Sequence, residues 1–414
     1  MRFNKAIYWA LILATLGSSA FLAYQIPAVN QRFGWRLDFA LTYLRGIIQP
    51  AGKLPTALPP PEIIITSLPE PATTLLLTTE QTPGFTPTSP PPATAIPGKV
   101  SLATPKWEKQ DINNCGPATL TMYLRYYGWE GNQDDIASLL KPKREDRNVN
   151  VEELAYYVRT QVGWLNVDYR VGGNLNRLKQ LIAAGIPVMI EESFYFENPY
   201  WPKDDLWAAH YNLLTGYDDP SQTFTTQDSF YGSNQQVQYQ DLEKYWQVFN
   251  YLYIMIYPPD QQETVKTILG ADWDPNINRQ NALKLAETQT RTDPSNAFTW
   301  FNLGSNLVYF ERYSEAALAY DKARQIGLPQ RMLRYQFGPF FAYFHTGRIA
   351  DLMALTRYAL QRTPTSEEAL LWQGWGYYRQ GKTREAIENF RAALEQNPNY
   401  SDAQYALDFI LSQK

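Results

Sequence analysis

The chain has 414 residues, 44% of them hydrophobic and 19% charged, with a formal net charge of -4. This length exceeds one ordinary core and predicts two folded domains with further segments. Because Lys and Arg are scattered along the sequence, nucleic acid is not an expected partner. The single cysteine, Cys115, excludes an intramolecular disulfide and a cysteine-cluster metal site, and the two histidines, His210 and His345, leave little for zinc. We therefore expect no cofactor.

Residues 1–31 are predicted to form a transmembrane anchor or a signal segment. Arg2 and Lys5 precede an uncharged run over 6–31, and its strongly apolar part, 6–24, is about long enough to cross a bilayer as a helix. We predict an uncleaved single-pass anchor in the cell membrane, with the bulk of the chain on the extracytoplasmic side. The small residues Ser18, Ser19 and Ala20 leave signal cleavage and secretion as the alternative.

Residues 32–49 are predicted to form a short amphipathic helix. Its apolar residues recur at spacings of three or four, as expected of one helix face: Phe33, Leu37, Leu41, Leu44 and Ile48. Such a helix could lie on the membrane surface, or it could pack on the folded part of the chain.

Residues 50–98 form a linker rich in proline and threonine. Thirteen of the 29 prolines and ten threonines fall between Pro50 and Pro97, with almost no charge. This composition cannot bury a core, so the segment is predicted to be a semi-rigid stalk that holds a domain away from a membrane.

Residues 99–260 are predicted to form an α+β domain. Apolar periodicity predicts helices over 116–127, 151–162 and 175–184, and short apolar runs predict buried strands over 186–190 and 213–217. A helix-rich beginning followed by strands is typical of the α+β class.

Residues 261–414 change period and are predicted to form an all-α repeat array. Small and aromatic residues recur at a constant offset of 70, or two units of about 35: Gly304, Ala316, Tyr320 and Ala323 match Gly374, Ala386, Phe390 and Ala393. The pattern resembles tetratricopeptide repeats, with Trp300 to Gly304 as the clearest signature. Such repeats imply a protein partner bound to the array.

The first residue that indicates a catalytic function is Cys115. It precedes Gly116, Pro117 and Ala118, where an apolar helix face begins. Proline suits the first turn of a helix, and the positive end of the helix dipole favours a thiolate there. A lone cysteine is usually a small buried hydrophobe, but this context predicts a nucleophile.

A nucleophilic thiolate needs a base and a group that orients the base. His210 heads an apolar strand, and the next strand, 223–229, contains Asp228. If the two strands form a hairpin through the turn at 218–221, His210 and Asp228 lie at the same end. A structural histidine and a turn-forming aspartate are the alternatives.

The cysteine, histidine and aspartate motifs, in this order, resemble the bacteriocin-processing (double-glycine leader) peptidase-like family, non-transporter type, over roughly residues 100–258. The resemblance implies a papain-like cysteine peptidase fold. It also implies that Cys115 is the nucleophile, His210 the general base and acid, and Asp228 the residue that holds the imidazole. Gln110 matches the glutamine that would bind the oxyanion with the Cys115 backbone N–H.

Two features depart from the relatives that process leader peptides. Those are fused to a transporter with a nucleotide-binding domain, and this sequence contains no Walker-type glycine loop. Acidic and aromatic residues also precede His210 over 191–207. They could form one lip of a cleft for basic or extended ligands, or a solvated surface loop.

These observations predict an extracytoplasmic cysteine peptidase that acts on a peptide or amide bond, with a repeat domain that binds protein. Two alternatives stay open. One is a scaffold in which the peptidase-like domain is catalytically silent, and the other is a transamidase that uses the same three residues.

Overall fold

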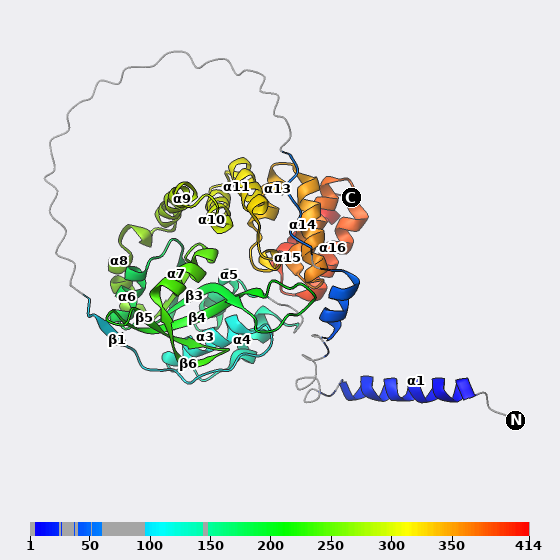
Figure 1. The fold of residues 1–414 in the computed structure, drawn as a ribbon, viewed down its shortest axis with the longest axis horizontal. Coiled ribbons are helices and arrows are strands. Elements are labelled where there is room, and N and C mark those ends of the chain that lie inside the picture. The colour runs from blue at the N-terminus through cyan, green and yellow to red at the C-terminus, as the bar shows by residue number, and fades with distance from the viewer. Residues whose placement is uncertain are drawn as a thin grey trace, which may run out of the picture.

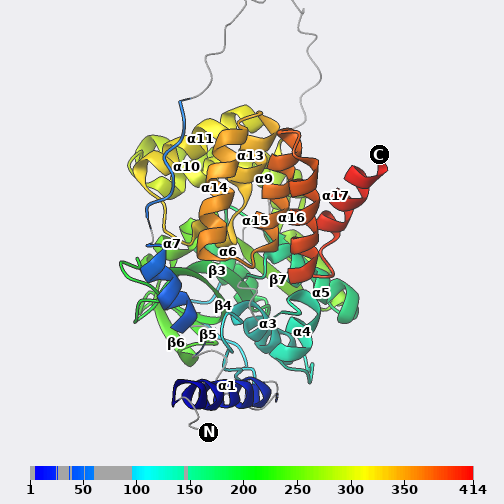
Figure 2. The ribbon, with the colours of Figure 1, turned by 90° about the vertical axis from the view of Figure 1, so that its right-hand side faces the viewer.

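The structure is a computed structural model, and it describes residues 5–24, 26, 37, 40–50, 52–59, 96–143 and 148–413. Most of the predicted stalk therefore lies outside the described residues. An α+β domain and an array of helical hairpins fill the described part of the chain after residue 96, and the array arches over the sheet from α9 to α17 (Figures 1 and 2).

The N-terminal segment begins with a helix, α1 (Lys5–Tyr24), that covers the predicted apolar span. Across the described parts of the chain, no helix combines the length and the apolarity that crossing a membrane requires. The prediction of a helix is thus confirmed, whereas its transmembrane placement is not supported.

Residues 40–48 are helical, as predicted, but they pack on the folded chain with an unexpected face. Thr42 and Gly46 are buried, and a Cβ added to Gly46 would lie 2.4 Å from the Cβ of Trp201. The described residues of the predicted apolar face, Leu37, Leu41, Leu44 and Ile48, are exposed. The small residues therefore dock this helix, and its apolar face remains outside.

The α+β class is confirmed for the part of the chain before the repeats. Each predicted helix agrees with an observed one within two residues. The two observed strands continue beyond their predicted ranges, β3 at its carboxyl end and β4 at both ends. The helices are α3 (Cys115–Tyr126), α4 (Gln133–Leu140), α5 (Val151–Gln161), α6 (Leu175–Ala183), α7 (Tyr239–Trp246) and α8 (Gln262–Leu269). The strands are β1 (Lys99–Ser101), β2 (Asn166–Arg170), β3 (Val188–Tyr195), β4 (Trp207–Asp218), β5 (Thr223–Asp228), β6 (Gly232–Gln238) and β7 (Tyr253–Tyr257).

All strand pairs of the sheet are antiparallel, in the order β2-β7-β3-β4-β5-β6, with β1 paired to the end of β4. The predicted hairpin exists: β4 and β5 pair with Asp218 opposite Thr223 and Leu213 opposite Gln227. On the other side of β4, His210 lies opposite Glu192 of β3. The sequence-distant residues of the site are therefore brought together by strand register.

Apolar side chains cover both faces of the sheet. One buried cluster joins α3 and α5 to the sheet through residues such as Leu120, Leu154 and Leu213, and it continues into the repeat region. A second cluster joins α6, α7 and α8 to the opposite face, with Leu178 and Leu214 at its centre. Burial of such side chains stabilises the fold by about 25 cal/mol for each Å² of apolar surface removed from water.

The repeat region consists of paired helices, as predicted. It comprises α9 (Pro275–Thr292), α10 (Ala297–Tyr309), α11 (Tyr313–Ile326), α12 (Met332–Tyr335), α13 (Gly338–His345), α14 (Ile349–Arg362), α15 (Glu367–Arg379), α16 (Thr383–Gln396) and α17 (Ser401–Ser412). The hairpin α10–α11 and the hairpin α15–α16 begin and end 70 residues apart. The glycines fit this geometry, because a Cβ on Gly304 would lie 2.7 Å from the ring of Tyr320 and one on Gly374 would lie 2.5 Å from the ring of Phe390.

The repeat helices are bound to the α+β part by side-chain amides that reach across the boundary. Asn250 and Asn306 exchange two hydrogen bonds, at 2.8 and 3.3 Å. Asn278 receives the Val171 N–H and donates to the Val171 carbonyl. Because these bonds satisfy buried polar groups on both sides, the boundary is a specific interface.

Candidate active site

Cys115 is the first residue of α3, as the Gly-Pro-Ala sequence predicts. The loop before it is held by Gln133, whose Oε1 accepts hydrogen bonds from the Asp111 backbone N–H (2.8 Å) and the Asn114 amide (2.7 Å). Lys141 donates to the Asn113 carbonyl at 2.7 Å, and Asn113 has a positive φ of 57°. Buried side chains thus fix the position at which the helix starts.

The start of α3 is docked against β4. The Thr119 hydroxyl donates to the Tyr211 carbonyl at 3.0 Å, and the Tyr211 backbone forms a hydrogen bond with the Cys115 thiol. Since His210 precedes Tyr211 on β4, these contacts bring the imidazole to the amino end of the helix. His210 and Cys115 are hydrogen-bonded through their side chains.

His210 is also bonded to Asp228, which ends β5. The His210 Nε2 lies 3.1 Å from the Asp228 Oδ1, and both side chains are buried. This leaves the other ring nitrogen, Nδ1, for the thiol. The same Asp228 oxygen accepts the backbone N–H groups of Phe230 (2.7 Å) and Tyr231 (3.0 Å), so the carboxylate is held in one orientation.

The electrostatics favour an ionised pair. Burial opposes ionisation of the Cys115 thiol, but the hydrogen bond and charge of His210 outweigh it and lower the thiol pKa. Burial also disfavours the imidazolium, yet the bonds to Asp228 and Cys115 raise the pKa of His210 to about 10. Burial opposes ionisation of Asp228 as well, but the bond and charge of His210 lower its pKa. A thiolate beside an imidazolium is the nucleophilic state of a cysteine.

Gln110 lies beside this group. Its backbone N–H donates to the Ser229 carbonyl at 2.9 Å, and its Oε1 accepts the Ser229 hydroxyl at 2.9 Å. With Oε1 engaged, the amide nitrogen is the part of the side chain that can donate to a ligand. Ser229 follows Asp228, so the residue that orients the imidazole and the predicted oxyanion donor share one support.

The four predicted residues surround or support one pocket of about 260 Å³, with Cys115, His210 and Gln110 in its lining and Asp228 behind the imidazole. Five aromatic residues line the rest of the pocket, together with Ala209, Ser229 and other residues of the loop 109–113. Phe194 lies 5.1 Å from the His210 ring and 5.2 Å from Phe230, measured between ring centroids. The other aromatic residues in the wall are Phe196, Tyr200 and, from α12 of the repeat region, Tyr335.

The segment over 191–207 agrees in part with one of the two interpretations that its sequence allowed, a lip of the cleft. Residues up to Tyr195 belong to β3, and Trp201 and Trp207 are buried, so it is not a solvated loop. It does contribute a lip of the pocket through Phe196 and Tyr200. Its acidic residues, however, do not line the pocket and give no basis for preferring basic ligands.

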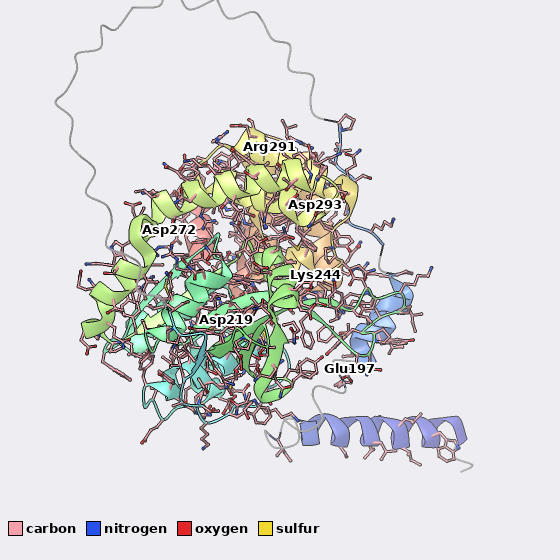
Figure 3. All side chains as sticks on the ribbon, turned by 60° about the vertical axis from the view of Figure 1, so that its left-hand side comes forward. Glu197, Asp219, Lys244, Asp272, Arg291 and Asp293 are labelled. Carbon is pink, nitrogen blue, oxygen red and sulfur yellow. The ribbon has the colours of Figure 1, made fainter. Side chains whose placement is uncertain are left out.

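Two acidic residues of this loop, Asp204 and Asp205, form ion pairs with Arg331 of the repeat region. Both Nη atoms of Arg331 donate to the Asp204 carboxylate at 2.6 Å, and both side chains are buried. The Arg331 guanidinium also lies 3.9 Å from the centre of the Trp201 ring. Figure 3 shows Glu197, near the start of this loop, on the side of the molecule where the helix of residues 40–48 lies.

Two further acids are buried near the thiol and the imidazole: Glu191, opposite Tyr211, and Glu192, opposite His210. Glu192, opposite His210, accepts a 3.1 Å hydrogen bond from the Asn212 amide. Burial is the main reason why the pKa of Glu192 rises to about 7, and burial also raises the pKa of Glu191 well above its usual range. From the sequence, these acids are expected only at a lip of the cleft. The register of β3 against β4 was the signal that could have placed Glu192 beside His210.

Cys115, His210, Asp228 and Gln110 therefore lie together, although their catalytic roles remain predictions. The sequence predicts Phe194 only as part of a possible lip over 191–207, and it does not predict Phe230 or Tyr335 as parts of the pocket. Tyr335 carries no local signal, because it reaches the pocket only through the packing of the repeats on the sheet.

Comparison with protein families gives two matches. The Peptidase_C39 like family matches residues 101–254, and the tetratricopeptide repeat matches residues 367–400. No curated protein sequence matches the chain.

Solved structures with similar parts include peptidases and repeat proteins. A C39-like peptidase from Bacillus anthracis has 17% identity and a TM-score of 0.31, covering 38% of this chain and 96% of its own. Xylellain, a cysteine protease from Xylella fastidiosa, has 14% identity and a TM-score of 0.30, covering 40% and 87%. YrrB, a tetratricopeptide-repeat protein with an unusual peptide-binding site, has 20% identity and a TM-score of 0.29, covering 36% and 74%.

Proposed function

The chain carries a Peptidase_C39-like domain over residues 101–254 followed by tetratricopeptide repeats, and on this premise we propose that it is a thiol hydrolase of peptide bonds. The observation that supports the proposal most is the hydrogen-bonded series from the partly buried Cys115 thiol through the buried His210 to the buried Asp228. A nucleophile, its base and an orienting acid are the three parts that acyl transfer through a thiol needs.

The reaction begins with the thiolate. The Cys115 sulfur attacks the carbonyl carbon of the substrate, and the carbonyl π electrons move to oxygen. As the C–N bond breaks, the His210 imidazolium gives its proton to the amine nitrogen, and a thioester remains on Cys115. A water molecule then attacks the thioester and gives a proton to His210. The carboxylic acid leaves, and the thiolate and imidazolium are restored.

The negative oxygen of each tetrahedral intermediate needs donors. The Cys115 backbone N–H lies in the first turn of α3, where helix N–H groups have no intrahelical acceptor. The Gln110 amide nitrogen is the second donor. Loss of one such donor costs about 10²–10³ in kcat in enzymes that use an oxyanion hole.

The pocket favours a large apolar side chain next to the bond that is cut. One part of its wall is built from the aromatic rings of Phe194, Phe196, Tyr200 and Phe230, and the repeat region adds Tyr335. Contacts between aromatic rings contribute roughly 0.5–1.5 kcal/mol beyond the area that they bury. The repeats would then take part in substrate binding as well as in binding a protein partner.

The reactivity of Cys115 tests the proposal. The full chain should be alkylated once by iodoacetamide near neutral pH, much faster than a model thiol such as glutathione, and Cys115→Ala should abolish both alkylation and peptide cleavage. A silent scaffold predicts slow alkylation. A transamidase predicts that added amine, and not water, accepts the acyl group, which mass spectrometry of the products would reveal.

We also propose that the N-terminal segment holds the protein at a membrane, with the folded part on the extracytoplasmic side. Large apolar side chains are exposed on α1, among them Leu13, Leu16 and Leu22, and Leu44 and Ile48 are exposed on the docked helix of residues 40–48. Protease protection and fractionation of cells that express the full chain test this placement. Recovery of the intact protein in the soluble fraction would contradict it.

A further inference from the structure

Residues 49–58 leave the helix of residues 40–48 and run along the repeat region beside α11 and α14 (Figure 2). Apart from residue 51, this stretch is described throughout, and it has no regular secondary structure. We call it the N-terminal strap. Although it belongs by composition to the predicted stalk, its first part is bound to folded protein.

The strap is bound mainly through its main-chain carbonyl groups. Arg324 donates to the Pro55 carbonyl from Nε at 3.0 Å and from Nη2 at 2.7 Å. The other donors to the strap follow the same pattern: Arg362 to the carbonyls of Gln49 (3.4 Å) and Pro50 (3.0 Å), Tyr358 to that of Gly52 (3.1 Å), and Arg348 to that of Leu58 (3.2 Å).

This arrangement suits a ligand rich in proline. A proline has a carbonyl acceptor but no N–H donor, so it cannot pair as a strand does. The repeat surface offers side-chain donors to the carbonyls and one acceptor, Asp351 Oδ1, which receives the Leu58 N–H at 3.1 Å. The donors and acceptors of the surface therefore match those of an extended proline-containing main chain.

The donors are held in place before they meet the strap. Arg324 donates to Asp351 at 3.0 Å and to the Tyr343 hydroxyl at 2.8 Å, while Arg348 donates to Asp321 at 2.6 Å. The side chains of Arg324 and Asp351 are 1% and 3% exposed. The charges of Arg324 and Arg348 are matched by those of Asp321 and Asp351, so neither of these two arginines is buried as an unpaired charge.

One side chain of the strap is also recognised. Leu54 is 7% exposed and belongs to the hydrophobic core cluster, whereas Leu58 is 48% exposed. Full burial of a leucine contributes about 1.5–3 kcal/mol. The surface is therefore selective for an apolar residue at the position of Leu54, next to Pro55.

We propose that this face of α11 and α14 is a binding site for an extended, proline-containing peptide segment, and that its ligand is residues 49–58 of the same chain. The arginines bind the main-chain carbonyl groups of the segment, and the site of Leu54 accommodates one apolar side chain. The tether from α1 is thereby fastened to the repeat region.

The same contacts connect the strap to the lip of the pocket. The Tyr358 hydroxyl lies 3.1 Å from the Gly52 carbonyl and 3.3 Å from the Gln330 carbonyl. Gln330 in turn accepts a hydrogen bond from the Trp201 indole at 2.7 Å. The strap and the lip of the pocket are therefore held by neighbouring residues of the repeat region, Tyr358 and Gln330.

Tryptic cleavage of the full chain after Lys53 tests the docking, because Lys53 is exposed while the next residue, Leu54, is buried. Leu54→Ser should speed this cleavage at least tenfold, since a protease needs a freed segment. Leu58→Ser makes the same chemical change at an exposed strap position and should leave the rate near that of the wild type. Synthetic peptides of residues 49–60 with and without Leu54→Ser correct for the intrinsic preference of trypsin.

Binding in trans tests the site itself. A fluorescent peptide of wild-type residues 49–60 should bind the full-length Leu54→Ser chain, whose site is open, and should not bind the wild-type chain, whose own strap occupies the site at a high effective concentration. Equal cleavage of the two leucine variants would overturn the proposal. So would faster cleavage of Leu54→Ser without any peptide binding to it.

Discussion

The two walls of the pocket bury charged side chains in different ways. The sheet that forms one wall presents His210 to the pocket and buries Glu191, Glu192 and Asp228 behind it, and burial raises the pKa values of the two glutamates. The lip that the repeat region supports lines the pocket through Phe196 and Tyr200 and is held by the pair Arg331 and Asp204, joined by two hydrogen bonds of 2.6 Å. The sheet thus buries more acidic than basic side chains, whereas the lip supported by the repeat region buries one acid with one base.

The difference separates chemistry from positioning. Groups with shifted pKa values can change protonation state near neutral pH, which proton transfer requires. A buried arginine with a bidentate carboxylate cannot lose its charge, and it fixes the geometry of what surrounds it. The sheet therefore supplies reactive groups, and the repeat region holds the lip against which a substrate would lie.

The largest expected effect is on the matched pair. Arg331→Met leaves the fully buried Asp204 without its main partner, which should lower the free energy of unfolding by about 3–5 kcal/mol. Urea unfolding of the full chain measures it. Replacing both residues, as Arg331→Met with Asp204→Leu, should recover most of the loss.

The exposed pair of Arg312 and Glu315 provides the matched control. Arg312→Met should change stability by less than about 0.5 kcal/mol, because surface pairs are screened by solvent. Equal losses of unfolding free energy for Arg331→Met and Arg312→Met would show that the buried pair of Arg331 and Asp204 does not stabilise the fold.

The second effect concerns the sheet wall. His210→Ala removes the imidazolium that lowers the thiol pKa, so the pH profile of Cys115 alkylation should shift upward towards the ordinary value. At pH 6.5 the alkylation rate should fall steeply, since an unperturbed thiol with a pKa near 8.5 is only about 1% ionised there.

His345→Ala is the control, because the other histidine lies in the repeat region and should leave the profile unchanged. In the wild type the alkylation rate should reach half its maximum below the ordinary thiol pKa. An unchanged profile for His210→Ala would contradict the assignment of the pair.

Local patterns in the sequence were sufficient to predict part of this wall. The start of α3 at Cys115 follows from the Gly-Pro-Ala sequence, and the turn at 218–221 placed His210 and Asp228 at one end of a hairpin. Both features depend on residues close in sequence. The helix pairs of the repeat region were likewise predictable, because the 70-residue offset repeats a packing requirement between small and aromatic residues.

The other wall could not be predicted in this way. Arg331 and Asp204 are 127 residues apart, and no local pattern indicates that they meet. The helix of residues 40–48 shows a second limit. Its apolar spacing was recognised, but Thr42 and Gly46 form the packed face, because close contact with Trp201 requires a glycine and not a large side chain.

The third effect is a pH dependence of stability. Glu192 has an ordinary pKa of 4.5 when unfolded and a pKa of about 7 when folded. Between these values the folded state keeps a proton that the unfolded state has released, so stability falls as the pH rises. From pH 5.5 to pH 8 this group should remove about 2 kcal/mol.

Glu192→Gln keeps an acceptor for Asn212 and removes the titration, so its unfolding free energy should fall by about 2 kcal/mol less over that range. Glu197→Gln, at an exposed position in the following loop, should behave as the wild type does. Parallel pH profiles for the wild type and Glu192→Gln would mean that Glu192 is ionised in the folded protein.

The smallest effect tests whether the two walls act on one ligand. Tyr335→Ala removes the ring that the repeat region contributes to the pocket, and it should slow alkylation of Cys115 by a phenylalanyl chloromethyl ketone about fivefold, or roughly 1 kcal/mol. Alkylation by iodoacetamide, which has no side chain to place in the pocket, should be unchanged.

Tyr405→Ala, at a 66% exposed position of α17, controls for loss of an aromatic residue from the repeat region. Equal slowing of both reagents by Tyr335→Ala would indicate a general disturbance of the site. No slowing of either reagent would mean that the sheet wall alone defines the substrate pocket, and the repeats would then act only outside it.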